Sequence, residues 1–131
     1  MILPKGLNDL LGGVIEEAWI GIGSFLVLDL FTPEHGASVW IYLASWNINH
    51  DGIEVYCSET ADRSVHNSSL NDLASGKVVR DFHILNDNEI HIELSGGLFI
   101  EIWEDIDSYG PRAEAIIISK SGDYVESLNF D

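Results

Sequence analysis

The chain contains a single cysteine, Cys57, so no disulfide can form within it, and a lone thiol suits a reducing compartment. Basic residues are also scarce: six of them stand against 22 acidic residues, which gives a net charge of −16 at pH 7. This excess of acid repels phosphate backbones and anionic membranes. We therefore expect neither nucleic acid nor a membrane as a partner, and a cationic partner is favoured.

No uninterrupted apolar run approaches the roughly 18 residues that span a bilayer. The first residues also lack the basic stretch, the apolar segment and the small-residue cleavage site of a secretory signal peptide. We therefore expect a soluble, cytoplasmic protein. With 131 residues and 46% hydrophobic content, the chain suffices for one core and is too short for two ordinary domains. Residues 1–131 are predicted to form a single domain.

Catalytic motifs are missing as well. The sequence has no glycine-rich phosphate loop, no nucleophile elbow and no HExxH pair. No nucleophile signature surrounds Cys57, and three histidines, His35, His50 and His66, fall in polar stretches that are typical of solvated loops. We therefore predict that the protein is not an enzyme and that it needs no cofactor.

The sequence does contain an internal repeat. The letters LNDL at residues 7–10 return at residues 70–73, and the match continues into the segments that follow. Such self-similarity predicts two versions of one structural unit. At the same offset Glu17 corresponds to Arg80, which predicts an ion pair between them if the units pack about a twofold axis. The two units are about residues 7–57 and 70–128.

Alternation of apolar and polar residues predicts a mainly β chain. A short helical turn is expected at the start of each unit, around Leu7 and Leu70, and each turn is ended by glycine. The strands follow at turn-separated intervals. The expected strands are residues 14–20, 25–31, 39–46, 53–57, 78–85, 90–94, 98–103, 113–120 and 124–128.

Two segments matter for how these strands are arranged. Residues 39–46 are apolar on both faces, which indicates a central strand that is covered on two sides. Residues 58–69 are polar and unpatterned, and we expect a mobile loop that joins the two units. The predicted fold is two packed antiparallel sheets or a partly open barrel, with one or two short helices.

The register of three strands in the second unit can be predicted from their apolar faces. If Phe82 lies on the core face beside Ile92, a polar row forms on the opposite face. A three-residue loop before residue 98 then keeps Glu101 outside, whereas a two-residue turn would bury this carboxylate. His83, His91 and Glu101 are thus expected side by side on three adjacent strands.

This row has three readings. It is typical of a solvated strand face, on which polar residues alternate with buried ones. Two imidazoles and a carboxylate about 5 Å apart are also able to hold a divalent metal, so the protein could instead be a metal-dependent enzyme or a small-ligand-binding β protein that uses His83, His91 and Glu101. Finally, Phe99 and Trp103 on the same face could anchor a partner amid acidic residues.

Acidic residues continue beyond this face, at Glu104, Asp105 and Asp107, and these like charges repel one another unless a cation compensates. A calcium loop that begins at Asp105 is disfavoured because it lacks the glutamate at its twelfth position. We interpret the whole region as a partner-binding surface. Its predicted residues are Asp81, His83, His91, Glu93, Phe99, Glu101, Trp103, Glu104, Asp105, Asp107 and Tyr109.

The pattern LGGVI at residues 11–15, GIGSFL at residues 21–26, residues 40–46 and GKV at residues 76–78 resembles small β-rich bacterial immunity proteins of polymorphic-toxin and contact-dependent growth inhibition systems. The shared positions are structural, and no functional residue is carried over. The resemblance implies a cytoplasmic inhibitor that blocks a cognate toxin, often a basic nuclease. An acidic surface would suit such a cationic partner. A structural subunit without activity of its own is a further alternative.

Overall fold

The computed structural model describes residues 5–86, 88–109, 113–120 and 125–130. The strands of the first sheet are β1 (Val14–Ile20), β2 (Leu26–Phe31), β3 (Gly36–Ile41), β9 (Glu114–Lys120) and β10 (Val125–Asn129). The strands of the second sheet are β4 (Ser45–His50), β5 (Ile53–Cys57), β6 (Val79–Asn86), β7 (Glu89–Leu94) and β8 (Leu98–Trp103). The helices are α1 (Lys5–Asn8), α2 (Arg63–Ala74), α3 (Ile106–Tyr109) and a 3-10 turn, Ser95–Gly97.

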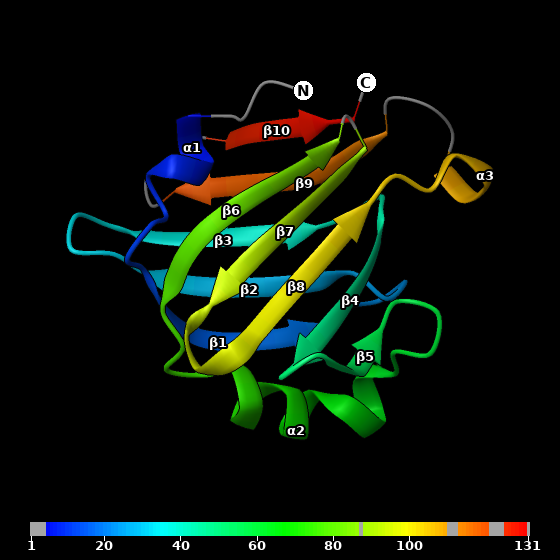
Figure 1. Ribbon diagram of the computed structural model, residues 1–131, viewed down its shortest axis with the longest axis horizontal. Coiled ribbons are helices and arrows are strands. Elements are labelled where there is room, and N and C mark those ends of the chain that lie inside the picture. Colours follow the sequence, from blue (N-terminus) through cyan, green and yellow to red (C-terminus); the bar gives the residue numbers. More distant parts are fainter. Residues whose placement is uncertain (1–4, 87, 110–112, 121–124, 131) are drawn as a thin grey trace.

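The two sheets pack face to face, with their strands crossing obliquely (Figure 1). Both are antiparallel, with the order β1-β2-β3-β9-β10 in the first and β5-β4-β8-β7-β6 in the second. The predicted mainly β fold of two packed antiparallel sheets is therefore confirmed. None of the helices in the described ranges is long and apolar enough to cross a membrane.

Alternate residues of the facing strands fill one hydrophobic core. On the central strand β8, Leu98, Ile100 and Ile102 are each at most 1% exposed, whereas their neighbours in sequence are half-buried on the outer face. Trp46 of β4 is fully buried among them, and its indole Nε1 donates a hydrogen bond to the carbonyl oxygen of Ser24 at 2.9 Å. Both sheets thus depend on the same interior for their stability.

The two sheets are built in the same way: each combines a three-strand meander from one predicted unit with a hairpin from the other. The meander β1-β2-β3 is extended by β9 and β10, and the meander β6-β7-β8 is extended by β4 and β5. The chain changes sheet between Ile41 and Ser45, so the predicted single strand over residues 39–46 is wrong. The inward-facing residues of β3 are odd-numbered and end at Ile41, whereas those from Ala44 through β4 are even-numbered. This change of parity makes residues 39–46 apolar on both faces.

The starts of the two predicted units meet each other. Val14 and Val78 form an isolated antiparallel bridge, which is flanked by a hydrogen bond from the N–H of Ile15 to the carbonyl oxygen of Lys77 at 2.8 Å. The predicted ion pair of Glu17 with Arg80 is wrong, because the ion pairs within the described ranges do not include these two residues. At their starts, the two units are thus joined by backbone hydrogen bonds and not by this ion pair.

Residues 58–69 do not form the predicted loop, because α2 begins within them. Asp62 caps the helix, and its Oδ1 accepts a hydrogen bond from the N–H of Ser64 at 2.9 Å. Hydrogen bonds from the hydroxyl and the N–H of Ser64 lower the pKa of Asp62. The helical turn predicted around Leu70 lies in the last part of this helix. Periodicity does not show the turns before it, because Leu70 and Ala74 are the only buried residues of α2.

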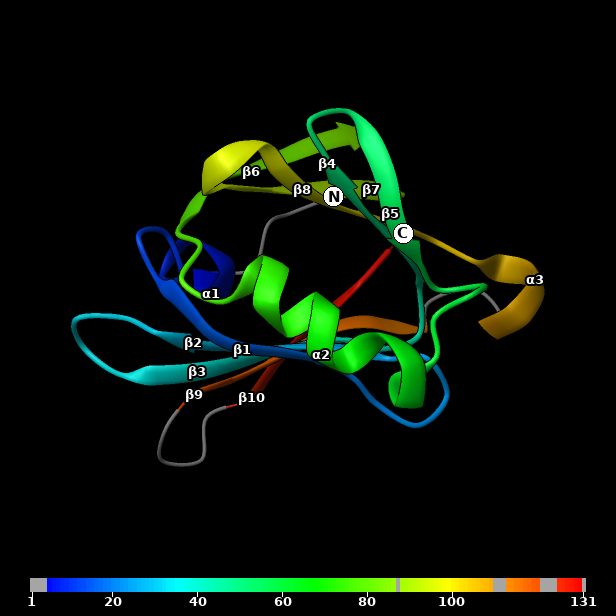
Figure 2. The same cartoon turned by 90° about the horizontal axis from the view of Figure 1, so that it is seen from below.

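Helix α2 covers the exposed edge of the first sheet, where β1 has no neighbouring strand (Figure 2). The side-chain oxygen of Asn71 accepts a hydrogen bond from the N–H of Ala18 at 2.9 Å. Asn67, one helical turn earlier, accepts from the N–H of Ile20 at 2.6 Å and donates to its carbonyl oxygen at 3.3 Å. The two asparagines thus replace the backbone of a neighbouring strand.

Candidate functional site

The outer face of the second sheet carries the row that the sequence predicts. Phe82 pairs with Ile92, His83 with His91, and His91 with Glu101, so the predicted register is confirmed. The residues that the structure places on this face are Asp81 and His83 of β6, His91 and Glu93 of β7, and Phe99, Glu101 and Trp103 of β8. Glu104, Asp105, Asp107 and Tyr109 follow in the connection and in α3.

The three members of the row do not act as one cluster. The Nε2 atom of His83 lies 3.0 Å from a carboxylate oxygen of Glu93 and 4.0 Å from one of Asp81. Its ring also lies 6.4 Å from the ring of Phe99, measured between centroids. His83 is therefore paired with the acids of its own end of the face rather than with Glu101.

His91 sits between two other carboxylates. Its Nε2 atom lies 2.6 Å from Oε2 of Glu89 and 3.1 Å from Oε2 of Glu101. The other carboxylate oxygen of Glu101, Oε1, accepts a hydrogen bond from the side-chain amide of Asn49. One ligand atom each from Glu89, His91 and Glu101 lies within 4.8 Å of the others, so this group is able to hold a metal ion. Glu89 was missed because the strand was expected to begin at residue 90, although it shares the parity of His91.

The acidic connection after β8 is partly structural. Asp105 Oδ2 accepts a hydrogen bond from the hydroxyl of Ser45 at 2.8 Å, and Oδ1 accepts one from the N–H of Ser108 at 3.1 Å. The Ser45 hydrogen bond lowers the pKa of Asp105, partial burial opposes this effect, and Ser108 adds to it. Glu104 and Asp107 form no ion pair within the described ranges, so their charges are available to a partner.

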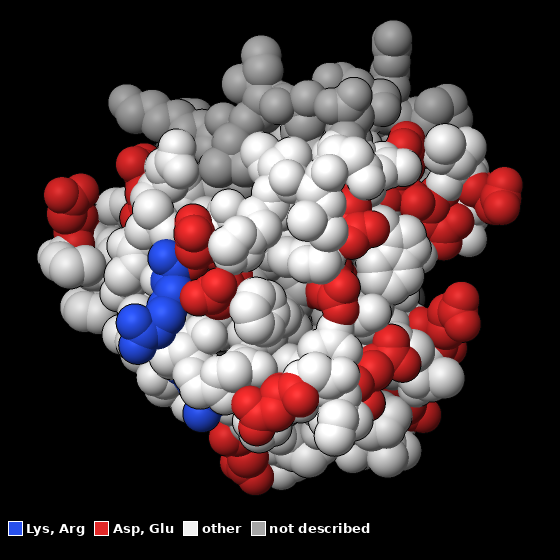
Figure 3. Space-filling view, viewed as in Figure 1, with Lys and Arg blue, Asp and Glu red and all other residues white. Residues whose placement is uncertain are grey.

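We define the acidic face as the outward side chains of β6, β7 and β8 together with Glu104 and Asp107. Figure 3 shows acidic side chains across this face and around its right-hand rim, with basic side chains confined to the left-hand side. Phe99 and Trp103 are half-buried between the carboxylates. The predicted surface therefore exists as one acidic region, and its two aromatic side chains are partly covered.

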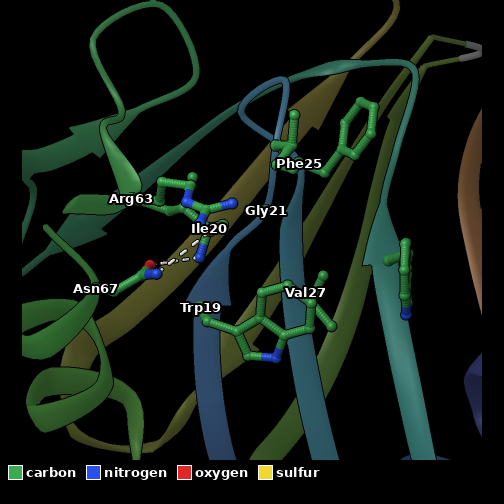
Figure 4. A pocket seen from close by; sticks show the side chains of 9 residues that line it. Trp19, Ile20, Gly21, Phe25, Val27, Arg63 and Asn67 are labelled. Carbon is green, nitrogen blue, oxygen red and sulfur yellow. Dashed lines mark hydrogen bonds between the residues drawn. The ribbon is translucent and has the colours of Figure 1, made fainter.

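A second feature, which sequence reasoning missed, lies on the outer face of the first sheet (Figure 4). Trp19, Val27 and Trp40 are neighbours across three strands there, and a hollow of about 480 Å³ opens above them. The signal was present in the outward positions of the three strands, but it needs their register. We call this feature the aromatic hollow. Its lining residues are Trp19, Ile20, Gly21, Ile22, Phe25, Val27, Trp40, Arg63 and Asn67.

Comparisons of the chain with protein-family models, with curated proteins and with solved structures give no match. The acidic face and the aromatic hollow lie on opposite sheets.

Proposed function

We propose that the protein is a non-enzymatic bacterial immunity protein that acts in the cytoplasm and neutralises a cognate cationic toxin through the acidic face. The observation that carries the proposal is the concentration of carboxylates on one sheet. The outward positions of β7 and β8 hold Glu89, Glu93 and Glu101 and no lysine or arginine. Like charges at this spacing repel one another, and a cationic partner relieves that repulsion.

The mechanism would be occlusion of the toxin's active site. In a toxin that acts on nucleic acid, lysine and arginine line the cleft that holds the substrate phosphates. The carboxylates of the acidic face would occupy the positions of those phosphates, and Phe99 and Trp103 would pack at the centre of the contact. Opposite net charges would speed association and exclude mismatched partners.

Reversal of two free charges tests this proposal. In the variant Glu104→Lys/Asp107→Lys, the association rate with a toxin captured from the source organism should fall about tenfold or more at low salt, because electrostatic steering is weakened. The salt dependence of the rate should also flatten. Stopped-flow measurements over a series of salt concentrations give both quantities. Asp105 is left intact because its hydrogen bonds support α3.

A matched control changes the net charge by the same amount, but at residues that lie outside the acidic face. Glu34 lies in the loop between β2 and β3, and Asp72 lies on α2; both side chains are exposed. The variant Glu34→Lys/Asp72→Lys should keep the wild-type association rate within about twofold, since its charges lie away from the contact. Equal losses in both variants would mean that only net charge matters, and unchanged rates in the first variant would refute the acidic face as the binding surface.

A second candidate function is metal binding at Glu89, His91 and Glu101, which the 4.8 Å grouping of their ligand atoms favours. If the group binds zinc or manganese, a metal concentration 100 times the Kd should stabilise the fold by about 2.7 kcal/mol. Thermal unfolding with each metal salt measures this as a rise in Tm. The rise should disappear in His91→Gln and persist in His83→Gln, and a metal-independent Tm in the wild type would rule out this candidate.

A further inference from the structure

The aromatic hollow has walls that are already in position. The rings of Trp19 and Trp40 meet edge to face with centroids 6.1 Å apart, and Val27 lies between them on the neighbouring strand. Val27 is only 1% exposed although it lies outside the core between the sheets. The two indoles therefore cover an apolar floor, and Phe25 closes one end of the hollow (Figure 4).

Polar contacts fix these walls. The indole Nε1 of Trp19 donates a hydrogen bond to Asp29 at 3.3 Å, and the other carboxylate oxygen of Asp29 accepts one from the hydroxyl of Ser38 at 2.6 Å. On the opposite side, the amide of Asn67 is held by the backbone of Ile20. A ligand would thus meet a preformed site, which reduces the entropy lost on binding.

Arg63 is the only charged side chain among the described residues that line the hollow. It is the first residue of α2, and it forms no ion pair with another described residue. The neighbouring Asp62 is turned to the N–H of Ser64. The chain carries a net charge of −16, yet Arg63 has no carboxylate partner among the described residues. A guanidinium in this position favours a ligand that is itself negatively charged.

We propose that the aromatic hollow binds a small planar aromatic anion, with its ring against Trp19 and Trp40 and its anionic group at Arg63. The volume of about 480 Å³ lies within the range typical of small-molecule sites and admits one or two fused rings. Arg63 would repel the cationic partner that suits the acidic face. The hollow is therefore a separate site with a ligand of opposite charge.

The test compares two molecules of nearly equal shape. Wild-type protein is titrated with 2-naphthoate, which is anionic, and with 2-naphthamide, which is neutral, while the indole N–H signals are followed by NMR. The naphthoate should shift the signals of Trp19 and Trp40 and leave that of Trp103, on the opposite sheet, in place. We expect the naphthoate to bind about tenfold more tightly than the amide, the effect of one charge-assisted hydrogen bond.

Two arginine variants test whether the preference for the anionic ligand depends on Arg63. Arg63→Gln should bring the affinity for naphthoate down to that for naphthamide, whereas Arg80→Gln on β6 should keep the wild-type preference. Both side chains are exposed, so both variants should fold. The proposal is overturned if the Trp19 and Trp40 signals do not move, if the two molecules bind equally to the wild type, or if Arg80→Gln removes the preference as fully as Arg63→Gln does.

Discussion

Replacement of Trp46 by alanine is expected to lower the free energy of unfolding by about 3–5 kcal/mol, because the indole is fully buried between the sheets and its removal leaves a large cavity. The change also leaves the carbonyl oxygen of Ser24 without the hydrogen bond from the indole. Since the total free energy of unfolding of a single domain is only about 5–15 kcal/mol, this single change removes much of the stability.

Urea unfolding followed by circular dichroism measures the loss as a shift of the midpoint. Trp46→Phe separates the two contributions, because it keeps most of the ring and removes the hydrogen-bond donor; its loss should be about 1–3 kcal/mol. Trp103→Ala, on the half-buried outer face, is the matched control and should cost clearly less than Trp46→Ala. Equal losses in the two alanine variants would contradict the central position of Trp46 in the core.

The second large effect is expected where α2 covers the edge of the first sheet. In Asn67→Ala/Asn71→Ala, the N–H groups of Ala18 and Ile20 lose their acceptors, and each loss should cost about 1–3 kcal/mol. Alanine has a higher helix propensity than asparagine, so the substitutions should stabilise the helix itself. A lower free energy of unfolding must therefore come from the lost hydrogen bonds. The uncovered edge should also pair with other chains, which size-exclusion chromatography at increasing concentration detects.

The control for this experiment lies on the solvent side of the same helix. Ser68 and Asp72 are exposed on α2, and Ser68→Ala/Asp72→Ala should unfold at or slightly above the wild-type midpoint while it elutes like the wild type. If the asparagine variant unfolds at the wild-type midpoint and does not associate, then α2 does not protect the edge.

The difference between the predicted and the observed fold has physical causes in particular segments. The register of β6, β7 and β8 was predictable because β7, β8 and residues 81–84 of β6 each keep one parity of apolar residues facing the core. Residues 39–46 could not be divided correctly, since their parity changes where the chain passes between sheets. The helical turn predicted around Leu70 lies within α2, but residues 63–69 of this helix were missed because they contact β1 through Asn67, and periodicity detects only apolar contacts.

The two candidate sites also differ in whether the sequence alone could predict them. The acidic face could be predicted because its strands are consecutive in the chain and short loops fix their pairing. The aromatic hollow could not, because it combines β1, β2 and β3 with Arg63 and Asn67 from the first two turns of α2, which periodicity does not reveal. Residues from distant segments become a site only when the fold is known.

The hairpins β4-β5 and β9-β10 each join the sheet formed by strands of the other unit, and this affects how the chain folds. Strand β3 pairs with β9, so that Val39 lies beside Ile118, and β4 pairs with β8 in the other sheet. Such distant pairings close large loops and slow folding. During synthesis, β3 gains its second neighbouring strand only after β9 has been made. Each sheet combines strands from both predicted units, so neither unit completes a sheet alone and the native pairing requires both.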